Sequence, residues 1–437
     1  MTGFEIGLLA LAAMGLLVLA GMHVPVALIL CSFAGVWAIT GSPLLASRLV
    51  ALAANESISS YFFGVVPLFV LMGFLVAEAG LGRDAYEVAN RAFARLRGGL
   101  GVGTVGANAI FAAVTGISIA SAAVFTRIAV PEMIRAGYAP RFAVGVVAGS
   151  SVLGMLIPPS LLLILYGILA EQSIGDMFIA GIGPGIVLSL AFGVGIVLMA
   201  TLTPGFVGRP VPVAGPAMPL AETLAKAGPI TLLILVVLGG IYGGIFTPVE
   251  AGAIGAIAAL AIGMARRRLG WRQLWSVLVE TGLVTAAICF LIIAAQIYAR
   301  MLSLSGVPQG LARAAAEADL GFWGLMLAYV GAVILLGMIL DSSSILLIAV
   351  PLMLPVLAPM QVDLVWFGIV TVIAVEIGLL TPPFGISVYV IKSALDDATI
   401  GLGDIFRGAL PFAGLMLAVL GLVMAFPVLS LGLVPGR

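Results

Sequence analysis

The chain has 437 residues, of which 62% are hydrophobic and 9% are charged, and its formal net charge is zero. Soluble domains carry roughly 25% charged residues, so a water-soluble fold could not cover this much apolar surface. The composition therefore predicts an integral membrane protein with the lipid bilayer as its solvent. A net charge of zero gives no reason to expect a nucleic-acid partner.

Few residues could hold a metal or carry out redox chemistry. Cys31 and Cys289 lie inside apolar runs, and His23 is the single histidine. One histidine and two separated cysteines predict no zinc, disulfide or redox site. The sequence also lacks a glycine-rich Walker loop, so ATP is not the expected energy source. We expect neither an enzyme nor a bound organic cofactor.

A spanning helix needs about 20 apolar residues. Apolar runs of this kind lie near 5–20, 25–40, 61–79, 143–170, 177–202, 228–246, 249–265, 276–302, 365–392 and 409–431. No basic segment precedes the first run, which therefore predicts a retained span rather than a cleaved signal. Residues 83–97 have arginines at helical spacing, which predicts an amphipathic helix at the cytoplasmic interface, with a basic loop as the alternative.

Two further apolar regions, 98–135 and 320–360, are broken in the middle by small and polar residues. Broken backbone at membrane depth is tolerated only where it is buried in protein or lines a cavity. These regions therefore predict two re-entrant helical hairpins.

The basic residues predict the orientation of this topology. If the N-terminus is periplasmic and each hairpin returns to its own side, four basic residues outside the hairpins lie at the outer face: Arg48, Arg300, Arg313 and Arg437. Fourteen lie at the cytoplasmic face: Arg83, Arg91, Arg95, Arg97, Arg135, Arg141, Arg209, Lys226, Arg266, Arg267, Arg268, Arg272, Lys392 and Arg407. This bias follows the positive-inside rule and predicts that the hairpins open to opposite sides.

The two halves of the chain share short motifs in the same order. Leu156-Ile157-Pro158-Pro159 corresponds to Leu380-Thr381-Pro382-Pro383, and Gly175-Asp176 corresponds to Gly403-Asp404. We therefore expect an inverted repeat with a first half (1–203), a proline-rich linker (204–227) and a second half (228–437). Each proline pair should interrupt its helix, because proline lacks an N–H donor and restricts the preceding residue. The expected fold is an all-α polytopic membrane protein with two re-entrant hairpins and two discontinuous helices.

Each hairpin tip offers oxygen ligands. The first tip contains Thr115, Ser118 and Ser121, and the second contains Asp341 followed by three serines. A carboxylate in an apolar hairpin is costly unless it is paired with a cation or hydrogen-bonded. Asp341 is thus a candidate ion ligand, and a helix N-cap is its alternative role. The hydroxyl groups are about as consistent with packing as with ion binding.

Two further polar residues have several interpretations. Glu376 shares its span with the second proline pair, where a buried hydrogen bond is expected and a proton relay is the alternative. Arg127, inside the first hairpin, could meet an anionic substrate, pair with Glu132 or face a helix C-terminus.

Several stretches resemble one family along nearly the whole chain. They are 106–116, Pro131-Glu132-Met133, Leu156-Ile157-Pro158-Pro159-Ser160, Thr247-Pro248-Val249-Glu250-Ala251 and 378–385. In these motifs the chain resembles the large membrane subunit of the tripartite ATP-independent periplasmic (TRAP) transporters, the DctM-like permeases. The resemblance implies a multi-pass protein of the bacterial inner membrane that moves its substrate by an elevator mechanism coupled to Na⁺, with Na⁺ the only metal. It also implies a separate, small four-helix membrane subunit and a periplasmic binding protein that delivers an organic acid.

The resemblance further implies two Na⁺ sites, each between a hairpin tip and the unwound span of the same half. The first would use Thr115, Gly116, Ser118, Ser121, Gly154 and Pro158. The second would use Gly337, Asp341, Ser342, Gly378, Thr381 and Pro382. Ser160 and Arg127 are candidate substrate contacts. Ile117 stands where many relatives carry serine, and Ser121 stands close to where some carry aspartate, which leaves the ligand set of the first site open. Glu376 stands where asparagine is frequent.

The sequence therefore predicts a Na⁺-coupled permease that imports a carboxylate. The alternatives are a stand-alone symporter coupled to H⁺ or Na⁺ that needs no binding protein, and a membrane-embedded enzyme or assembly scaffold.

Overall fold

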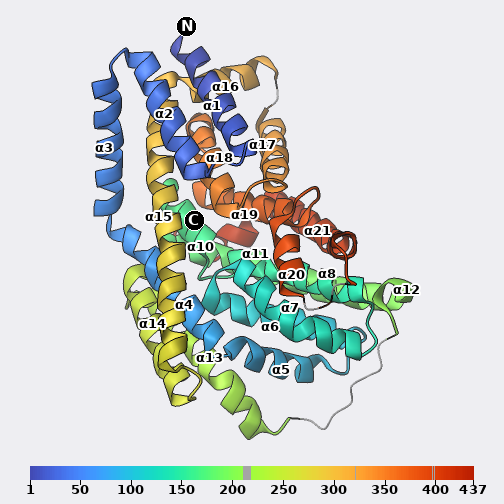
Figure 1. Cartoon of the computed structure of the whole chain (residues 1–437). Helices are drawn as coiled ribbons and strands as arrows, with labels where there is room; N and C mark the ends of the chain where they lie inside the picture. Colours follow the sequence, from blue (N-terminus) through green and yellow to red (C-terminus); the bar gives the residue numbers. More distant parts are fainter. Residues whose placement is uncertain (210–217, 320, 396, 398) are drawn as a thin grey trace.

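The computed structural model describes residues 1–209, 218–319, 321–395, 397 and 399–437 (Figure 1). Their regular structure is helical, and no β-strand occurs among them. Seven helices in the described part are long and apolar enough to cross a membrane, or eight if the bent pair Pro140–Leu156 and Leu161–Leu169 counts as one span. The all-α membrane architecture expected from composition is confirmed.

One group of helices, here called the scaffold, packs around the long helix α15 (Trp271–Ser305) on the left of Figure 1. α15 contacts α1 (Gly3–Leu19), α2 (Val24–Thr40), α3 (Pro43–Ser59) and α4 (Val65–Glu78). The short 3-10 helix η1 (Tyr61–Gly64) precedes α4. α14 (Pro248–Ala265) packs on α4 and on α13 (Leu220–Tyr242). α16 (Val307–Glu317) follows α15.

The second group, here called the hairpin domain, contains both hairpins and both broken helices. The first hairpin is α6 (Gly99–Thr115) with α7 (Ser118–Arg135), and the second is α17 (Gly321–Gly337) with α18 (Ser342–Leu357). The first broken helix is α8 (Pro140–Ser151), α9 (Leu153–Leu156) and α10 (Leu161–Leu169), and the second is α19 (Leu364–Leu380) and α20 (Ile386–Ala394). The remaining elements are α11 (Ile174–Leu202), α12 (Pro204–Val207), η2 (Ala358–Met360), α21 (Leu402–Ala425) and α22 (Val428–Leu431).

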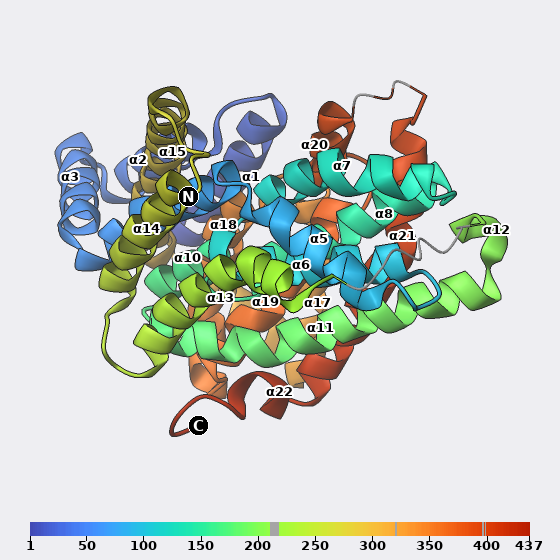
Figure 2. The same ribbon diagram turned by 90° about the horizontal axis from the view of Figure 1, so that it is seen from below.

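The two halves interlock within the hairpin domain. α8 from the first half packs along α21 from the second half, and Figure 2 shows both helices on the side away from α3. A Cβ at Gly145 of α8 would overlap the backbone of Gly408 in α21. Because Gly145 and Gly408 have no side chains, the two helix backbones touch at this crossing, as they do at small residues in membrane helix pairs.

The predicted elements agree with the structure with a few differences. Both hairpins and both interrupted spans are present at the expected residues. The amphipathic helix is α5 (Leu81–Phe93), so Arg95 and Arg97 follow its end. Two of the longer helices were not expected: α3 and the amphipathic α16. The polar residues of α3 interrupt its apolar run, although Ser42 and Pro43 at its start are typical of a helix N-terminus.

The expected linker is shorter than 204–227. Residues 220–227 belong to α13, which begins directly after Pro219, and 204–207 form α12. Residues 210–217 lie outside the described residues.

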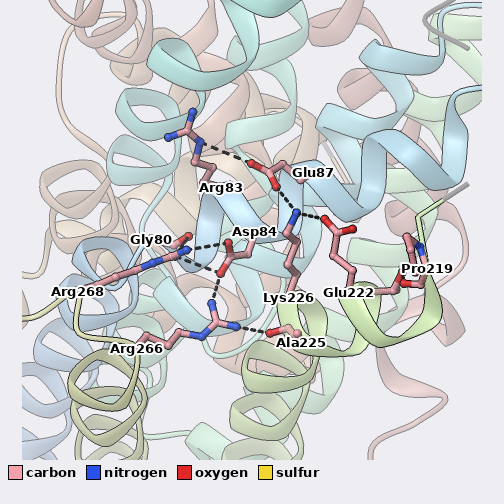
Figure 3. Close-up of polar contacts among 11 residues, drawn as sticks. Gly80, Arg83, Asp84, Glu87, Pro219, Glu222, Ala225, Lys226, Arg266 and Arg268 are labelled. Atoms are coloured by element: carbon pink, nitrogen blue, oxygen red, sulfur yellow. Dashed lines mark hydrogen bonds and ion pairs between the residues drawn. The ribbon is translucent and has the colours of Figure 1, made fainter. Parts of the chain in front are cut away.

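A polar cluster ties α5 to the scaffold helices α13 and α14 (Figure 3). The buried carboxylate of Asp84 forms ion pairs with Arg266 and Arg268, which follow α14. Arg268 also donates to the backbone carbonyls of Ala79 and Gly80. Because α5 packs directly on α6, this cluster positions the first hairpin against the scaffold.

Candidate ion and substrate site

The first hairpin tip contacts the break in its own half. Gly116 adopts the left-handed conformation (φ +63°), and a Cβ there would overlap the carbonyl of Pro159. The Leu161 N–H donates to the Gly116 carbonyl at 3.1 Å. Gly154 lies against the backbone of Ile117 and the hairpin residue after it. Glycine is therefore required at Gly116, both for its backbone conformation and for close approach.

The second tip repeats this arrangement. A Cβ at Gly337 would lie 2.7 Å from the Gly378 Cα, so the tip and the broken helix meet backbone to backbone. The Gly385 N–H donates to the Met338 carbonyl at 3.4 Å. The two candidate glycines of the second site therefore touch each other, whereas in the first site Gly116 touches the Pro159 carbonyl and Gly154 touches the backbone at Ile117.

Each proline pair lies in the break of its helix, as the sequence predicted. Pro158 lies between α9 and α10, and Pro382 lies between α19 and α20. Thr381 ends α19, and its hydroxyl donates to the carbonyl oxygens of Ile377 and Gly378. Ser160 is buried and caps α10, where its hydroxyl accepts from the Leu163 N–H. The Ser160 side chain therefore has a structural role at the break, and a substrate contact by it stays a prediction.

The hydroxyl groups of the first tip differ in their surroundings. Thr115 donates to the Phe111 carbonyl at 3.0 Å. Ser121 donates to Asn108 Oδ1 at 2.7 Å, and the Asn108 amide donates to Ser150 at 2.6 Å. Ser118 is fully buried, and its hydroxyl has no hydrogen-bond partner in the described part of the chain. Ser118 is thus the hydroxyl that can still form a hydrogen bond or bind an ion. Ser121 belongs to a buried hydrogen-bond network with Asn108, which the sequence analysis did not predict.

Asp341 caps the second arm of the second hairpin. Its carboxylate accepts from the backbone N–H groups of Ser343 and Ser344, each at 3.1 Å, and from the Ser344 hydroxyl. The N-cap alternative is therefore confirmed. One carboxylate has more acceptor sites than these donors fill, so ion binding by Asp341 stays a prediction.

Glu376 is a buried carboxyl between the hairpins. Ser342, at the second tip, donates to Glu376 Oε1 at 3.0 Å. The expected buried hydrogen bond is therefore confirmed, and Ser342 uses its proton in that bond while its lone pairs stay available.

Arg127 does not join the tips. It lies nine residues after Ser118 on α7, about 13 Å along the helix axis, and its side chain is exposed. The structure therefore provides no contact between Arg127 and the candidate ion ligands.

The donor atoms suit a hard monovalent cation. The tips and breaks present hydroxyl, carboxylate and carbonyl oxygens, and two buried oxygens there, Ser118 Oγ and Glu376 Oε2, have no partner among the described residues. No group of three or more His, Cys, Asp or Glu residues in the described part of the chain could hold a metal ion. Oxygen ligands without such a cluster fit Na⁺ better than a transition metal.

Paired helical hairpins that meet proline-broken helices define a class of protein. Discontinuous helices in repeated halves of a multi-pass protein are characteristic of secondary transporters, with sites at the broken segments. Residues 9–429 match the family model described as the tripartite ATP-independent periplasmic transporter, DctM component. The chain belongs to this family and is a TRAP transporter large permease.

Named relatives support the assignment. The chain is 33% identical over 390 residues to the C4-dicarboxylate TRAP transporter large permease protein DctM of Pseudomonas aeruginosa. The alignment covers 88% of this chain and 89% of that protein. It is 30% identical to the protein of the same name from Rhodobacter capsulatus, over 97% and 98% of the two chains. It is also 29% identical to the isethionate TRAP transporter permease protein DctMQ of Oleidesulfovibrio alaskensis, over 95% of this chain and 64% of that protein.

Two solved structures share the fold at low sequence identity. The Alcanivorax borkumensis YdaH transporter aligns with a TM-score of 0.60 and 16% identity over 89% of this chain and 90% of its own. Neisseria gonorrhoeae MtrF aligns with a TM-score of 0.61 and 14% identity over 90% and 87% of the two chains. At this identity the likeness concerns the fold alone.

Proposed function

We propose that this permease imports an organic anion across the bacterial inner membrane by Na⁺-coupled, elevator-type alternating access. Its partners would be a small four-helix membrane subunit and a periplasmic binding protein, and its N-terminus would be periplasmic. The observation that carries the proposal is the repeated contact of each hairpin tip with the break in its own half, Gly116 with Pro159 and Gly337 with Gly378.

These contacts suit ion-dependent ordering of the tips. Unwound backbone and hydroxyl groups lie at each contact, where a bound Na⁺ would join two otherwise separate segments. A ligand shifts a conformational equilibrium only by its differential affinity for the two states. Na⁺ held between tip and break would therefore favour the ordered tip and complete the substrate site.

The boundary between scaffold and hairpin domain supports relative movement of the two. A cavity of about 420 Å³ lies between α3 and α15 on one side and the segment joining α10 to α11 on the other. Its lining includes Ser57, Gln172, Gln296 and Arg300. The cavity leaves part of this boundary unpacked, so fewer side-chain contacts have to break there when the two groups of helices move.

The names of the relatives support an organic acid as the substrate class. Proteins named as C4-dicarboxylate, isethionate, sialic acid and ectoine TRAP permeases are similar to this chain. Dicarboxylates, isethionate and sialic acid are organic acids that carry one or more negative charges. We therefore propose a carboxylate or related anion as the substrate here.

The first test compares thermal stability of the purified complex in Na⁺, K⁺ and choline at equal ionic strength. An ion that binds only the folded state at 100 times its dissociation constant stabilises by about 2.7 kcal/mol. A rise specific to Na⁺ that Thr381→Ala removes is the expected result. Equal stability in all three salts would contradict Na⁺ coupling and favour the H⁺-coupled alternative.

The elevator step has its own test. Leu347 of α18 packs with Leu291 of α15 across the boundary between hairpin domain and scaffold. Cysteines at these two positions, with Cys31 and Cys289 replaced, should cross-link and stop uptake in liposomes until a reductant is added. Uptake by the fully cross-linked protein would refute movement at this boundary. Uptake of free substrate by the chain alone would favour the stand-alone symporter.

A further inference from the structure

Glu376 is held between the two hairpins rather than within one half. It lies on α19, 1% of it is exposed, and Ser342 of the second hairpin donates to its Oε1. The Ser118 hydroxyl of the first hairpin lies near the same carboxyl but makes no hydrogen bond of normal geometry with it. Within the described residues, neither Glu376 Oε2 nor Ser118 Oγ has a hydrogen-bond partner. Three oxygen-bearing side chains from three segments thus converge at one buried point.

The charge of this carboxyl is only partly offset by the protein. Among the described residues, no lysine, arginine or histidine forms an ion pair with Glu376. Ser118 and Ser342 are the first residues of α7 and α18, so two helix N-termini meet there, each equivalent to roughly half a positive charge. A buried carboxylate still costs several kcal/mol unless a close cation offsets it.

We propose that Glu376, Ser118 and Ser342 form a further monovalent-cation site, with Na⁺ as its occupant, that joins the two hairpins to each other. The proposal rests on the proposed Na⁺ coupling and adds a site to it. The ligand charge selects the ion: one carboxylate and two neutral hydroxyls match a single positive charge, whereas Ca²⁺ sites use several carboxylates. Both hydroxyls keep lone pairs for a cation, even though the Ser342 proton is donated to Glu376.

The site has a mechanical consequence. The two predicted tip sites each join a hairpin to the broken helix of its own half, but the Glu376 site takes one ligand from each hairpin. Occupancy would order both tips together, so a half-ordered state with one tip open would be disfavoured. Cation dependence should therefore be steeper than two independent sites would give.

The test counts ions on the purified complex with radioactive Na⁺ and follows thermal stability during Na⁺ titration, with choline keeping ionic strength constant. Glu376→Gln and Ser118→Ala are the test variants, and the exposed carboxylate of Glu280 supplies the matched control, Glu280→Gln. We expect Glu376→Gln to lose one bound Na⁺ per chain. Ser118→Ala, which keeps the charge, should raise the half-saturating Na⁺ concentration of one ion about tenfold, equivalent to 1.4 kcal/mol.

The outcomes separate this proposal from the proposed function. If the wild-type protein binds no Na⁺, the proposed coupling fails together with this site. If wild type binds Na⁺ and both test variants bind it equally well, the Glu376 site alone is refuted. Unchanged Na⁺ binding by Glu376→Gln with a lost dependence of stability on pH would identify a proton as the occupant and overturn the cation site. If Glu376→Gln does not fold, Glu376→Asp replaces it, because it keeps the charge but shortens the side chain, and an unchanged Na⁺ affinity of every bound ion would refute the Glu376 site.

Discussion

Replacing Gly337 by alanine should destabilise the second hairpin tip. A Cβ at this position would lie 2.7 Å from the Gly378 Cα and 3.1 Å from the Val375 carbonyl oxygen. Both neighbours are backbone atoms of α19, which cannot rotate away as a side chain could. Overpacking of this kind costs typically 1–3 kcal/mol, and we expect Gly337→Ala to cost about that much.

Gly331 gives a matched control in the same helix. It lies six residues earlier in α17, and no atom lies within 4 Å of a Cβ built there. Gly331→Ala should be neutral or stabilise by up to about 1 kcal/mol, because alanine has the higher helix propensity. The two substitutions are chemically identical, so the difference between them isolates the contact with α19.

Thermal melting of the purified complex, monitored in Na⁺ and in choline, measures both variants. We expect Gly337→Ala to lower the melting temperature and to lose part of the Na⁺-specific stabilisation, because it separates the tip from the break. Equal melting temperatures for the two variants would show that the tip and α19 do not meet at these glycines. Loss of stability without any change in the Na⁺ response would instead separate the contact from ion binding.

Three further substitutions test contacts in other parts of the chain. Asp84→Asn should destabilise by about 1.5–3 kcal/mol, since hydrogen bonds to charged groups are worth about that much. The control, Glu222→Gln at an exposed position, should change stability by less than about 0.5 kcal/mol. Equal melting temperatures for these two variants would contradict a structural role for the Asp84 cluster. Ser121→Ala leaves Asn108 Oδ1 unpaired and should cost about 1–3 kcal/mol in Na⁺ and choline alike, whereas loss of the Na⁺-specific part alone would make Ser121 an ion ligand. Thr247→Ala removes the capping box of α14 and should lower stability by about 0.5–2 kcal/mol in a melting assay, and no change would show that packing alone holds this helix start.

Sequence reasoning recovered the features that depend on local chemistry. Proline pairs interrupt helices wherever they occur, because the missing N–H and the restricted preceding residue act within one turn. The left-handed backbone of Gly116 and the cap at Asp341 likewise depend on neighbours in the sequence, whereas the contact of Gly116 with Pro159 depends on the fold. The helix α3 was not predicted because its polar residues interrupt the apolar run, although the N-cap Ser42 and the following Pro43 are typical of a helix N-terminus.

The sequence by itself indicated that the chain is a membrane protein, where its helices break and that Asp341 is a candidate cap of the second hairpin, because composition, proline and helix capping act over short distances. Only the tertiary structure decided which side chains meet: that Ser121 donates to Asn108, that Arg127 lies away from the tips, and that Ser118 and Ser342 converge on Glu376. These contacts join residues on different helices, in one case more than 250 positions apart. Their geometry follows from how whole helices pack, which no local pattern of residues encodes.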